Sequence, residues 1–437
     1  MIEFLIILLI GLVAGVFVGL LPGLPAYIGP LILYPFVSHL SIDQILAIWL
    51  ATHIGSQYFG SVAAILLKIP GEASSLIYIK DIDKLNSNER INLVRQTAWG
   101  STIGSITSLL VIGVIYYLGL ETELIQLSST SVKLTLLTLL MITMCWFTDH
   151  KKTSYLLFFI GFFFSHKTIE DIPLWMHQMQ RDYTFNITLF LLILAFLIIP
   201  EFINEIQKER KGDGLAIKSF IKEKLDFKSI FKGTWLGSLV GLVPGPSHIL
   251  AAVVSYNSYN KKETKKKIIS AESANNSAMI TSLLPFLYIG IPITLSEFLL
   301  NDLLQVKLFL IPMAFTQPWP LFTHINFIEF SFLMIAIISL VYHFLAQRFL
   351  RYYETFLNLM YGKLKFLFLL LIGYLIYIDV TFSLVYILPY LMLLLILSYV
   401  GWVLYKRNVN VLPLIFGFLL GDLLTWTSYQ FYQIYLS

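Results

Sequence analysis

Apolar runs long enough to cross a lipid bilayer recur along the chain. Examples are 96–120 and 325–346, and a helical crossing needs roughly 17–25 residues. The runs are continuous and lack the alternating ten-residue segments of a membrane β-barrel, the other fold that satisfies its backbone in lipid. Charged residues make up 13% of the chain, about half of the roughly 25% found in soluble domains. The sequence therefore predicts an all-α polytopic membrane protein.

Two glycine-rich segments, GVFVGLLPG and GSLVGLVPG, lie 222 residues apart and share their glycines and their final Pro-Gly. A second match, Ile69-Pro70 with Ile291-Pro292, has the same offset. Gly-xxx-Gly alone is common wherever membrane helices pack closely, but two separate matches at one offset indicate an internal duplication. We therefore divide the chain into a first repeat over 1–201, a basic linker over 202–232 and a second repeat over 233–437.

The distribution of positive charge places equivalent loops of the two repeats on opposite sides of the membrane. The loop 38–45 has no Lys or Arg, whereas its counterpart contains the lysine run 261–267. The next loop reverses the pattern, because 80–95 is basic and 302–317 has only one lysine. We expect crossings at 46–68, 96–120, 132–149, 153–165 and 184–200, and at 270–290, 325–346, 366–379, 382–404 and 409–427. An odd number of crossings per repeat inverts the second copy and predicts both termini outside.

One further segment in each repeat is predicted to enter the membrane and turn back. The segment 233–258 lies between two basic loops, and about 26 residues cannot cross twice at roughly 20 residues per crossing. It is expected to turn at Pro244-Gly245, where proline cannot donate and glycine accepts positive φ. By symmetry, the first copy turns at Pro22-Gly23. Two inverted-topology repeats, each of about five transmembrane helices plus one re-entrant hairpin, are typical of transporters that bind substrate near the midplane.

Four motifs, in order, resemble one family: GLLPGLPAYIGP, YFGSVAAILLKIPGEASS, GSLVGLVPGPSHILAAVVSY and ESANNSAMITSLLPFLYIGIP. They resemble the large permease subunit of the tripartite tricarboxylate transporters, over most of 10–105 and 230–295. The chain departs from the family pattern where Ile82 follows Asp81 and where Ile293 follows Pro292, both usually glycine positions, and it is somewhat short.

The resemblance implies a secondary active transporter for small carboxylates, such as di- or tricarboxylates, in the prokaryotic cytoplasmic (inner) membrane. It implies sodium as the coupling ion, with no other cofactor or metal. It also implies a small membrane subunit and a periplasmic or extracellular solute-binding protein as partners, and leaves a homo-oligomer open.

The expected substrate site combines the two Pro-Gly turns, the Ile-Pro-Gly-Glu stretch and the Asn pair of the second repeat. Half-helix N-termini at such turns bind anions, and buried carboxamides are costly in lipid unless something uses their dipoles. The expected substrate-binding residues are Pro22, Gly23, Leu24, Pro25, Ile69, Pro70, Gly71, Ser74, Pro244, Gly245, Pro246, Ser247, Asn275, Asn276 and Ser277. The ion-coupling candidates are Lys68, Glu72, Glu272, Asn275 and Asn276.

Each of these groups also has a structural interpretation. The turns can be simple kinks, the asparagines can join helices by hydrogen bonds, and Lys68 can extend to the interface and pair with Glu72. His53 and His248 can relay protons or serve as hydrogen-bonded packing groups. The basic linker and the lysine run set topology and contact anionic lipid; nucleic-acid binding is not expected.

Two other classes of protein remain as alternatives. An intramembrane enzyme would show a motif such as His-Glu-x-x-His, paired aspartates or a serine with a base. The sequence has none of these, so no catalytic residues are expected. A channel-like or structural membrane subunit could share the inverted architecture, and coupling of flux to an ion gradient would distinguish it from a transporter.

Overall fold

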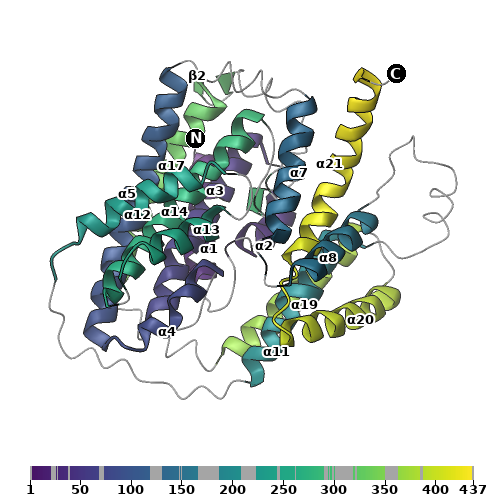
Figure 1. Ribbon diagram of the computed structural model, residues 1–437, viewed down its shortest axis with the longest axis horizontal. Helices are drawn as coiled ribbons and strands as arrows, with labels where there is room; N and C mark the ends of the chain where they lie inside the picture. Colours follow the sequence, from purple (N-terminus) through teal and green to yellow (C-terminus); the bar gives the residue numbers. More distant parts are fainter. Residues whose placement is uncertain are drawn as a thin grey trace. The chain divides into compact units, whose positions relative to one another are not determined.

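The structure is a computed structural model of the chain, shown in Figure 1. It describes residues 2–20, 26, 28–37, 40–67, 73–118, 130–146, 148, 150–165, 187–207, 223–243, 247–260, 262–289, 294, 296–297, 300, 318–319, 322–349, 363–383 and 387–435. The chain divides into two compact units. Unit 1 comprises Met1–Ser128 and Asp213–Leu357, and unit 2 comprises Ser129–Gly212 and Asn358–Ser437. Each unit thus combines a part of the first half of the chain with a part of the second, whereas the boundaries of the repeats stay a prediction.

The described elements are mainly helices. Those of unit 1 are α1 (Ile2–Leu20), α2 (Ile28–Val37), α3 (Ile42–Leu67), η1 (Ala73–Ile77), α4 (Ile79–Ile82), α5 (Ser87–Tyr117), α12 (Phe227–Val240), α13 (Ser247–Asn257), α14 (Thr264–Ile289), β1 (Pro318–Trp319), β2 (Phe322–Asn326) and α17 (Phe327–Phe349). Those of unit 2 are α7 (Thr130–Trp146), α8 (Lys151–Phe164), α10 (Leu189–Ile193), the π-helical turn η2 (Leu194–Ile198), α11 (Ile199–Gln207), α19 (Leu364–Ser383), α20 (Ile387–Lys406) and α21 (Leu412–Tyr435). Each expected crossing falls on a helix, and β1 pairs with β2 in a short antiparallel hairpin.

Helices α3 and α14 are the central elements of two similar helix pairs in unit 1. Each has 26 residues, and their bounds differ by the same 222 residues that relate the glycine motifs. Glycines allow α1 to lie directly against α3, and α12 against α14, without a Cβ between the backbones. The contacts are Gly11 with Ile48, Gly15 with Thr52 and Gly19 with Ser56, and, at the same offset, Gly233 with Ser270, Gly237 with Ala274 and Gly241 with Ala278.

Helices α12 and α13 are both too short to cross a bilayer. Their 14 and 11 residues correspond to about 21 Å and 16 Å, against a hydrocarbon core of about 30 Å. In the first half, α1 has 19 residues and is itself long and apolar enough to cross. The two Pro-Gly turns lie outside the described residues, so the re-entrant hairpins stay a prediction.

Four helices among the described residues are long and apolar enough to span a membrane. They are Ile2–Leu20, Ser87–Val114, Glu329–Ala346 and Ile387–Lys406. Many of their large apolar side chains are exposed, such as Leu110 on α5 and Leu395 on α20. An apolar exposed face is what a helix in contact with lipid requires, so these helices fit a membrane protein.

Unit 2 is held together by close backbone contacts and one buried carboxylate. Gly417 of α21 lies against the backbone of Phe158 in α8. The carboxylate of Asp379 in α19 accepts hydrogen bonds from Thr188 (2.6 Å) and Tyr390 (2.7 Å). Thr188 also caps α10, because its hydroxyl accepts from the Leu191 amide. Asp379 therefore joins the start of α10 to α19 and α20.

Candidate functional site

The candidate site is a buried polar cluster where α14 faces α3 within unit 1. Glu272 and Asn275 of α14 are each 2% exposed. The Glu272 carboxylate accepts hydrogen bonds from the hydroxyls of Ser61 in α3 and Tyr78, which lies between η1 and α4. Asn275 Nδ2 donates to Gln57 Oε1 of α3 at 3.0 Å. Both α14 side chains therefore contact groups from the other half of the chain.

Asn276, next to Asn275 on α14, has a buried side-chain carbonyl oxygen. Its Nδ2 donates to the Glu272 carbonyl one turn earlier at 2.9 Å. Its Oδ1 is fully buried and has no hydrogen-bond partner among the described residues. A buried polar atom left unsatisfied costs about 1–3 kcal/mol, so this oxygen is suited to a ligand that supplies a donor or a cation.

Ser277 is used differently from its two neighbours. Its hydroxyl lies 2.7 Å from the hydroxyls of Ser108 in α5 and Ser238 in α12, and it donates to the Thr234 carbonyl at 2.9 Å. This serine cluster joins α5, α12 and α14. The hydroxyl is occupied by helix packing, and the substrate-binding role expected for Ser277 stays a prediction.

Ser247 begins α13, directly after Pro244-Gly245-Pro246 in the sequence. It is 1% exposed, and its hydroxyl has no hydrogen-bond partner in the part of the chain that the structure describes. Ser74 of η1 is also buried, and α13 contacts η1. The other expected site residues lie outside the described residues: Pro22, Gly23, Leu24, Pro25, Lys68, Ile69, Pro70, Gly71, Glu72, Pro244, Gly245 and Pro246. Their roles stay predictions.

Gln57 and Ser61 belong to the cluster but were not among the site residues expected from the sequence. Together with His53 they form a polar row at every fourth position of α3, the spacing at which side chains of a helix share one face. In an otherwise apolar helix, this spacing was the signal that could have found them. Tyr78 carried no such signal, because its contact with Glu272 depends on the path of the chain after α3.

A second buried group lies one turn earlier on α3. His53 Nδ1 is 3.0 Å from the Ser296 hydroxyl, and Trp49 Nε1 donates to the Ser296 carbonyl at 3.0 Å. The indole of Trp49 stacks on the His53 ring, with centroids 5.0 Å apart and planes 20° apart. This group again joins the first half of the chain to the second.

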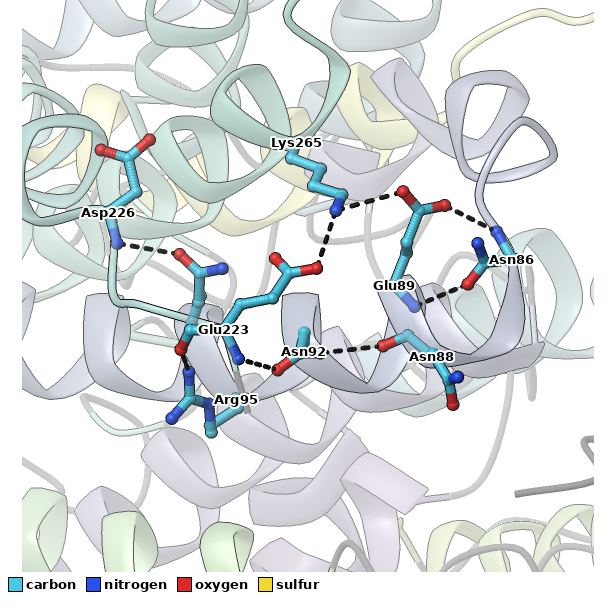
Figure 2. Close-up of polar contacts among 9 residues, drawn as sticks. Asn86, Asn88, Glu89, Asn92, Arg95, Glu223, Asp226 and Lys265 are labelled. Carbon is cyan, nitrogen blue, oxygen red and sulfur yellow. Dashed lines mark hydrogen bonds and ion pairs between the residues drawn. The ribbon is translucent and has the colours of Figure 1, made fainter. Parts of the chain in front are cut away.

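Polar contacts at the start of α5 hold the segment that leads into α12 (Figure 2). Lys265 Nζ lies 3.1 Å from Glu89 Oε1 and 3.0 Å from Glu223 Oε1. The Glu223 amide donates to Asn92 Oδ1 at 3.1 Å, and Arg95 donates to the Glu223 carbonyl. Burial lowers the pKa of Lys265, but its hydrogen bonds and ion pairs with the two glutamates raise that pKa by more. The end of the basic linker is therefore fixed to α5.

Asp81 in α4 forms another link between the two halves. Its carboxylate accepts hydrogen bonds from Lys84 and from Tyr256 of α13, and lies 3.5 Å from Lys267 Nζ. Lys267 Nζ is also 3.8 Å from the centroid of the Tyr256 ring. Burial raises the pKa of Asp81, but these hydrogen bonds and the two lysine charges lower it by more, to below its ordinary value.

The groups of the α3–α14 cluster are of kinds that can bind a polar ligand. The cluster offers amide and hydroxyl groups, which can both donate and accept hydrogen bonds, together with one carboxylate, which accepts them. Within the described residues, no group of three or more His, Cys, Asp or Glu side chains could hold a metal ion. Oxygen atoms that could contact a hard cation are the Glu272 carboxylate and Asn276 Oδ1.

Two comparisons with known proteins gave matches that cover most of the chain. A family model described as "Tripartite tricarboxylate transporter TctA family" matches residues 5–416. The chain is 26% identical over 311 residues to the "Uncharacterized 52.8 kDa protein in TAR-I ttuC' 3'region" of Agrobacterium vitis, which covers 65% of this chain. This match spans only 60% of that protein's length. No solved structure matches the chain.

Proposed function

Because the chain belongs to the tripartite tricarboxylate transporter TctA family, we propose that it is a permease that moves small carboxylates across the prokaryotic cytoplasmic membrane. The family expected from the four sequence motifs is confirmed. The proposed substrates are di- or tricarboxylates, moved by alternating access and coupled to sodium. Because the family is one of transporters, we propose no enzymatic activity.

The observation that carries the proposal is the buried α3–α14 cluster. Asn276 lies one turn after Glu272 on α14 and its Nδ2 donates to the Glu272 backbone carbonyl, while its Oδ1 lacks a hydrogen-bond partner among the described residues. The preceding residue, Asn275, donates to Gln57 of α3. Amide N–H groups can donate to substrate carboxylates, and amide and carboxylate oxygens can ligate sodium. The cluster draws its members from both halves of the chain, as a site between two repeats would.

The helix contacts support the inverted-repeat architecture. The glycine contacts of α1 with α3 recur in α12 with α14 at an offset of 222 residues, and an inverted repeat would show such a recurrence. The short α12 and α13 fit a hairpin that enters and leaves on one side. The division into two units, each built from both halves, suits an elevator in which one unit moves against the other.

The partners proposed are those of a tripartite system. A small membrane subunit would accompany the permease, and a periplasmic or extracellular solute-binding protein would deliver the carboxylate. A channel-like function is the competing proposal, because a pore could use the same duplicated architecture. The two differ in whether substrate can be concentrated at the expense of an ion gradient.

The test of the site is carboxylate uptake into proteoliposomes by the wild type, Asn276→Ala and Asn260→Ala. Asn260 is exposed and provides the matched control. We expect Asn276→Ala to lower uptake of labelled succinate or citrate at least tenfold, with Asn260→Ala within twofold of wild type. If wild type takes up nothing, the assay is repeated with a candidate solute-binding protein outside; continued absence of uptake would contradict the proposed function.

A further inference from the structure

The serine cluster lies where α5, α12 and α14 pack against one another in unit 1 (Figure 1). The hydroxyl oxygen of Ser277 in α14 is 2.7 Å from those of Ser108 in α5 and Ser238 in α12, and these two are 3.4 Å apart. Thr234, one turn before Ser238 on α12, contributes its backbone carbonyl, which accepts from the Ser277 hydroxyl at 2.9 Å. All four residues are at most 1% exposed.

The hydroxyls of this cluster are turned away from their own helices. A buried serine or threonine in a helix can donate to the carbonyl one turn earlier, as Ser101 and Ser105 of α5 do. Ser108 instead donates to the Ser277 carbonyl of α14, and Ser277 donates to the Thr234 carbonyl of α12. The hydroxyl oxygens are therefore directed to the junction of the three helices.

The junction has more oxygen lone pairs than donors. Each hydroxyl has one proton and two lone pairs, and each carbonyl oxygen has two lone pairs. The protons of Ser108 and Ser277 go to backbone carbonyls, and Ser238 meets the other two serine hydroxyls. The buried Thr234 hydroxyl has no hydrogen-bond partner in the described part of the chain. Buried oxygens without donors are costly unless a ligand uses them, and a hard cation is the ligand that oxygen lone pairs bind.

The equivalent place in the first half of the chain is filled by a tyrosine. The residues at an offset of 222 have no side-chain hydroxyl: Thr234, Ser238 and Ser277 correspond to Leu12, Val16 and Gly55. The Tyr342 hydroxyl of α17 lies there instead, against Gly55 and 2.9 Å from the Leu12 carbonyl oxygen. One large side chain closes the junction in the first half, whereas small hydroxyl groups line it in the second. Close helix packing is achieved in both halves and does not by itself require the hydroxyls.

The end of α12 adds partial negative charge to the junction. This helix of 14 residues ends at Val240, two residues after Ser238. Carbonyl groups without intrahelical donors make a helix C-terminus favourable for a cation, and half-helix ends of this kind coordinate the coupling cation in transporters with inverted repeats. The ligand oxygens are all neutral, which suits a monovalent ion, since divalent cations are usually bound with the help of carboxylates.

We propose that Ser108, Thr234, Ser238 and Ser277 bind a sodium ion at the junction of α5, α12 and α14. This inference rests on the proposed function, which includes sodium coupling, and adds a cation site separate from the α3–α14 cluster. Ser277 directly follows Asn276 on α14. An ion at the junction would therefore fix the turn of α14 that carries the candidate substrate site.

The test is thermal unfolding of the purified protein in detergent, without carboxylate, as sodium chloride replaces choline chloride at constant total salt. Wild type, Thr234→Val, Ser238→Ala and Thr97→Val are compared, each checked by its size-exclusion profile. Thr234→Val removes a hydroxyl that has no hydrogen-bond partner among the described residues, so it should melt no lower than wild type in choline. Thr97 of α5 is also 1% exposed, but it donates to a carbonyl of its own helix and provides the matched control.

Sodium should raise the melting temperature of wild type and Thr97→Val by about 3 °C or more, as for an ion well above its dissociation constant. In Thr234→Val and Ser238→Ala, the sodium concentration that gives half of this rise should increase about tenfold or more. A wild-type sodium response in both folded variants would refute the site while leaving the proposed function intact, and so would a wild type that sodium does not stabilise but that takes up carboxylates. A sodium response that the two variants lose, in a protein that takes up no carboxylate even with a solute-binding protein, would support the site and refute the proposed function.

Discussion

Replacing Gly237 by alanine would place a methyl group against the backbone of α14. A Cβ at this position would be 2.7 Å from Ala274 Cα and closer still to the Ala274 carbonyl oxygen. The obstacle is main chain, which cannot rotate away as a side chain can. To restore an ordinary contact of 3.4 Å or more, α12 would have to move from α14 by about 1 Å.

The loss of stability expected for Gly237→Ala follows from two opposing effects. Overpacking of a close contact costs about 1–3 kcal/mol, and a backbone obstacle justifies the upper part of this range. Alanine in place of glycine inside a helix returns about 1 kcal/mol. The net destabilisation expected for Gly237→Ala is therefore about 1–2 kcal/mol. At Gly113 of α5, an added Cβ would meet nothing within 4 Å among the described residues, so Gly113→Ala should instead stabilise by up to about 1 kcal/mol.

Thermal unfolding of the purified wild type and variants in the same detergent measures the difference in stability. We expect Gly237→Ala to melt below wild type and Gly113→Ala at or above it, with Gly15→Ala, at the equivalent position of α1, behaving as Gly237→Ala does. Equal melting temperatures for Gly237→Ala and Gly113→Ala would refute the close contact of α12 with α14.

Two further predictions concern the carboxylates of unit 1. Glu272→Gln removes a charge that a coupling cation would need, so the stimulation of uptake by sodium should fall at least fivefold; an unchanged sodium titration would exclude Glu272 from coupling. For Asp81, the depressed pKa means that its ionised form contributes stability above the ordinary carboxyl pKa of about 3.9. This contribution is lost as the pH falls through the lower folded-state pKa. Asp81→Asn should therefore melt below wild type at pH 7 and approach it as the pH is lowered toward 3; a constant difference would contradict the ion-pair account.

The positions of the helices could be predicted from the sequence because the long helices coincide with apolar runs and polar segments separate the runs. The glycine motifs likewise predicted close helix packing, which the contact of Gly237 with Ala274 bears out. Less predictable was the hairpin of β1 and β2, which lies between the expected loop and the crossing at 325–346. Its pairing covers few residues and leaves little pattern in the sequence.

The site itself was only half predictable. Glu272 and the two asparagines are conspicuous as polar groups in an apolar helix, whereas the partners of Glu272 depend on contacts between residues some 200 positions apart. Periodicity within a helix shows which residues share a face but not which helix that face meets. For the same reason, the division of each repeat between two units could not be derived from the order of the crossings.

The central claim, that the protein is a coupled carboxylate transporter, is tested most directly by concentrative uptake. Proteoliposomes containing the wild-type protein, with the solute-binding protein outside if it is needed, are given labelled succinate or citrate under an inward sodium gradient. We predict that the labelled substrate accumulates inside above its external concentration. This accumulation should be lost when a sodium ionophore is added. Uptake that only equilibrates across the membrane, with or without the gradient, would contradict a coupled transporter and favour a channel.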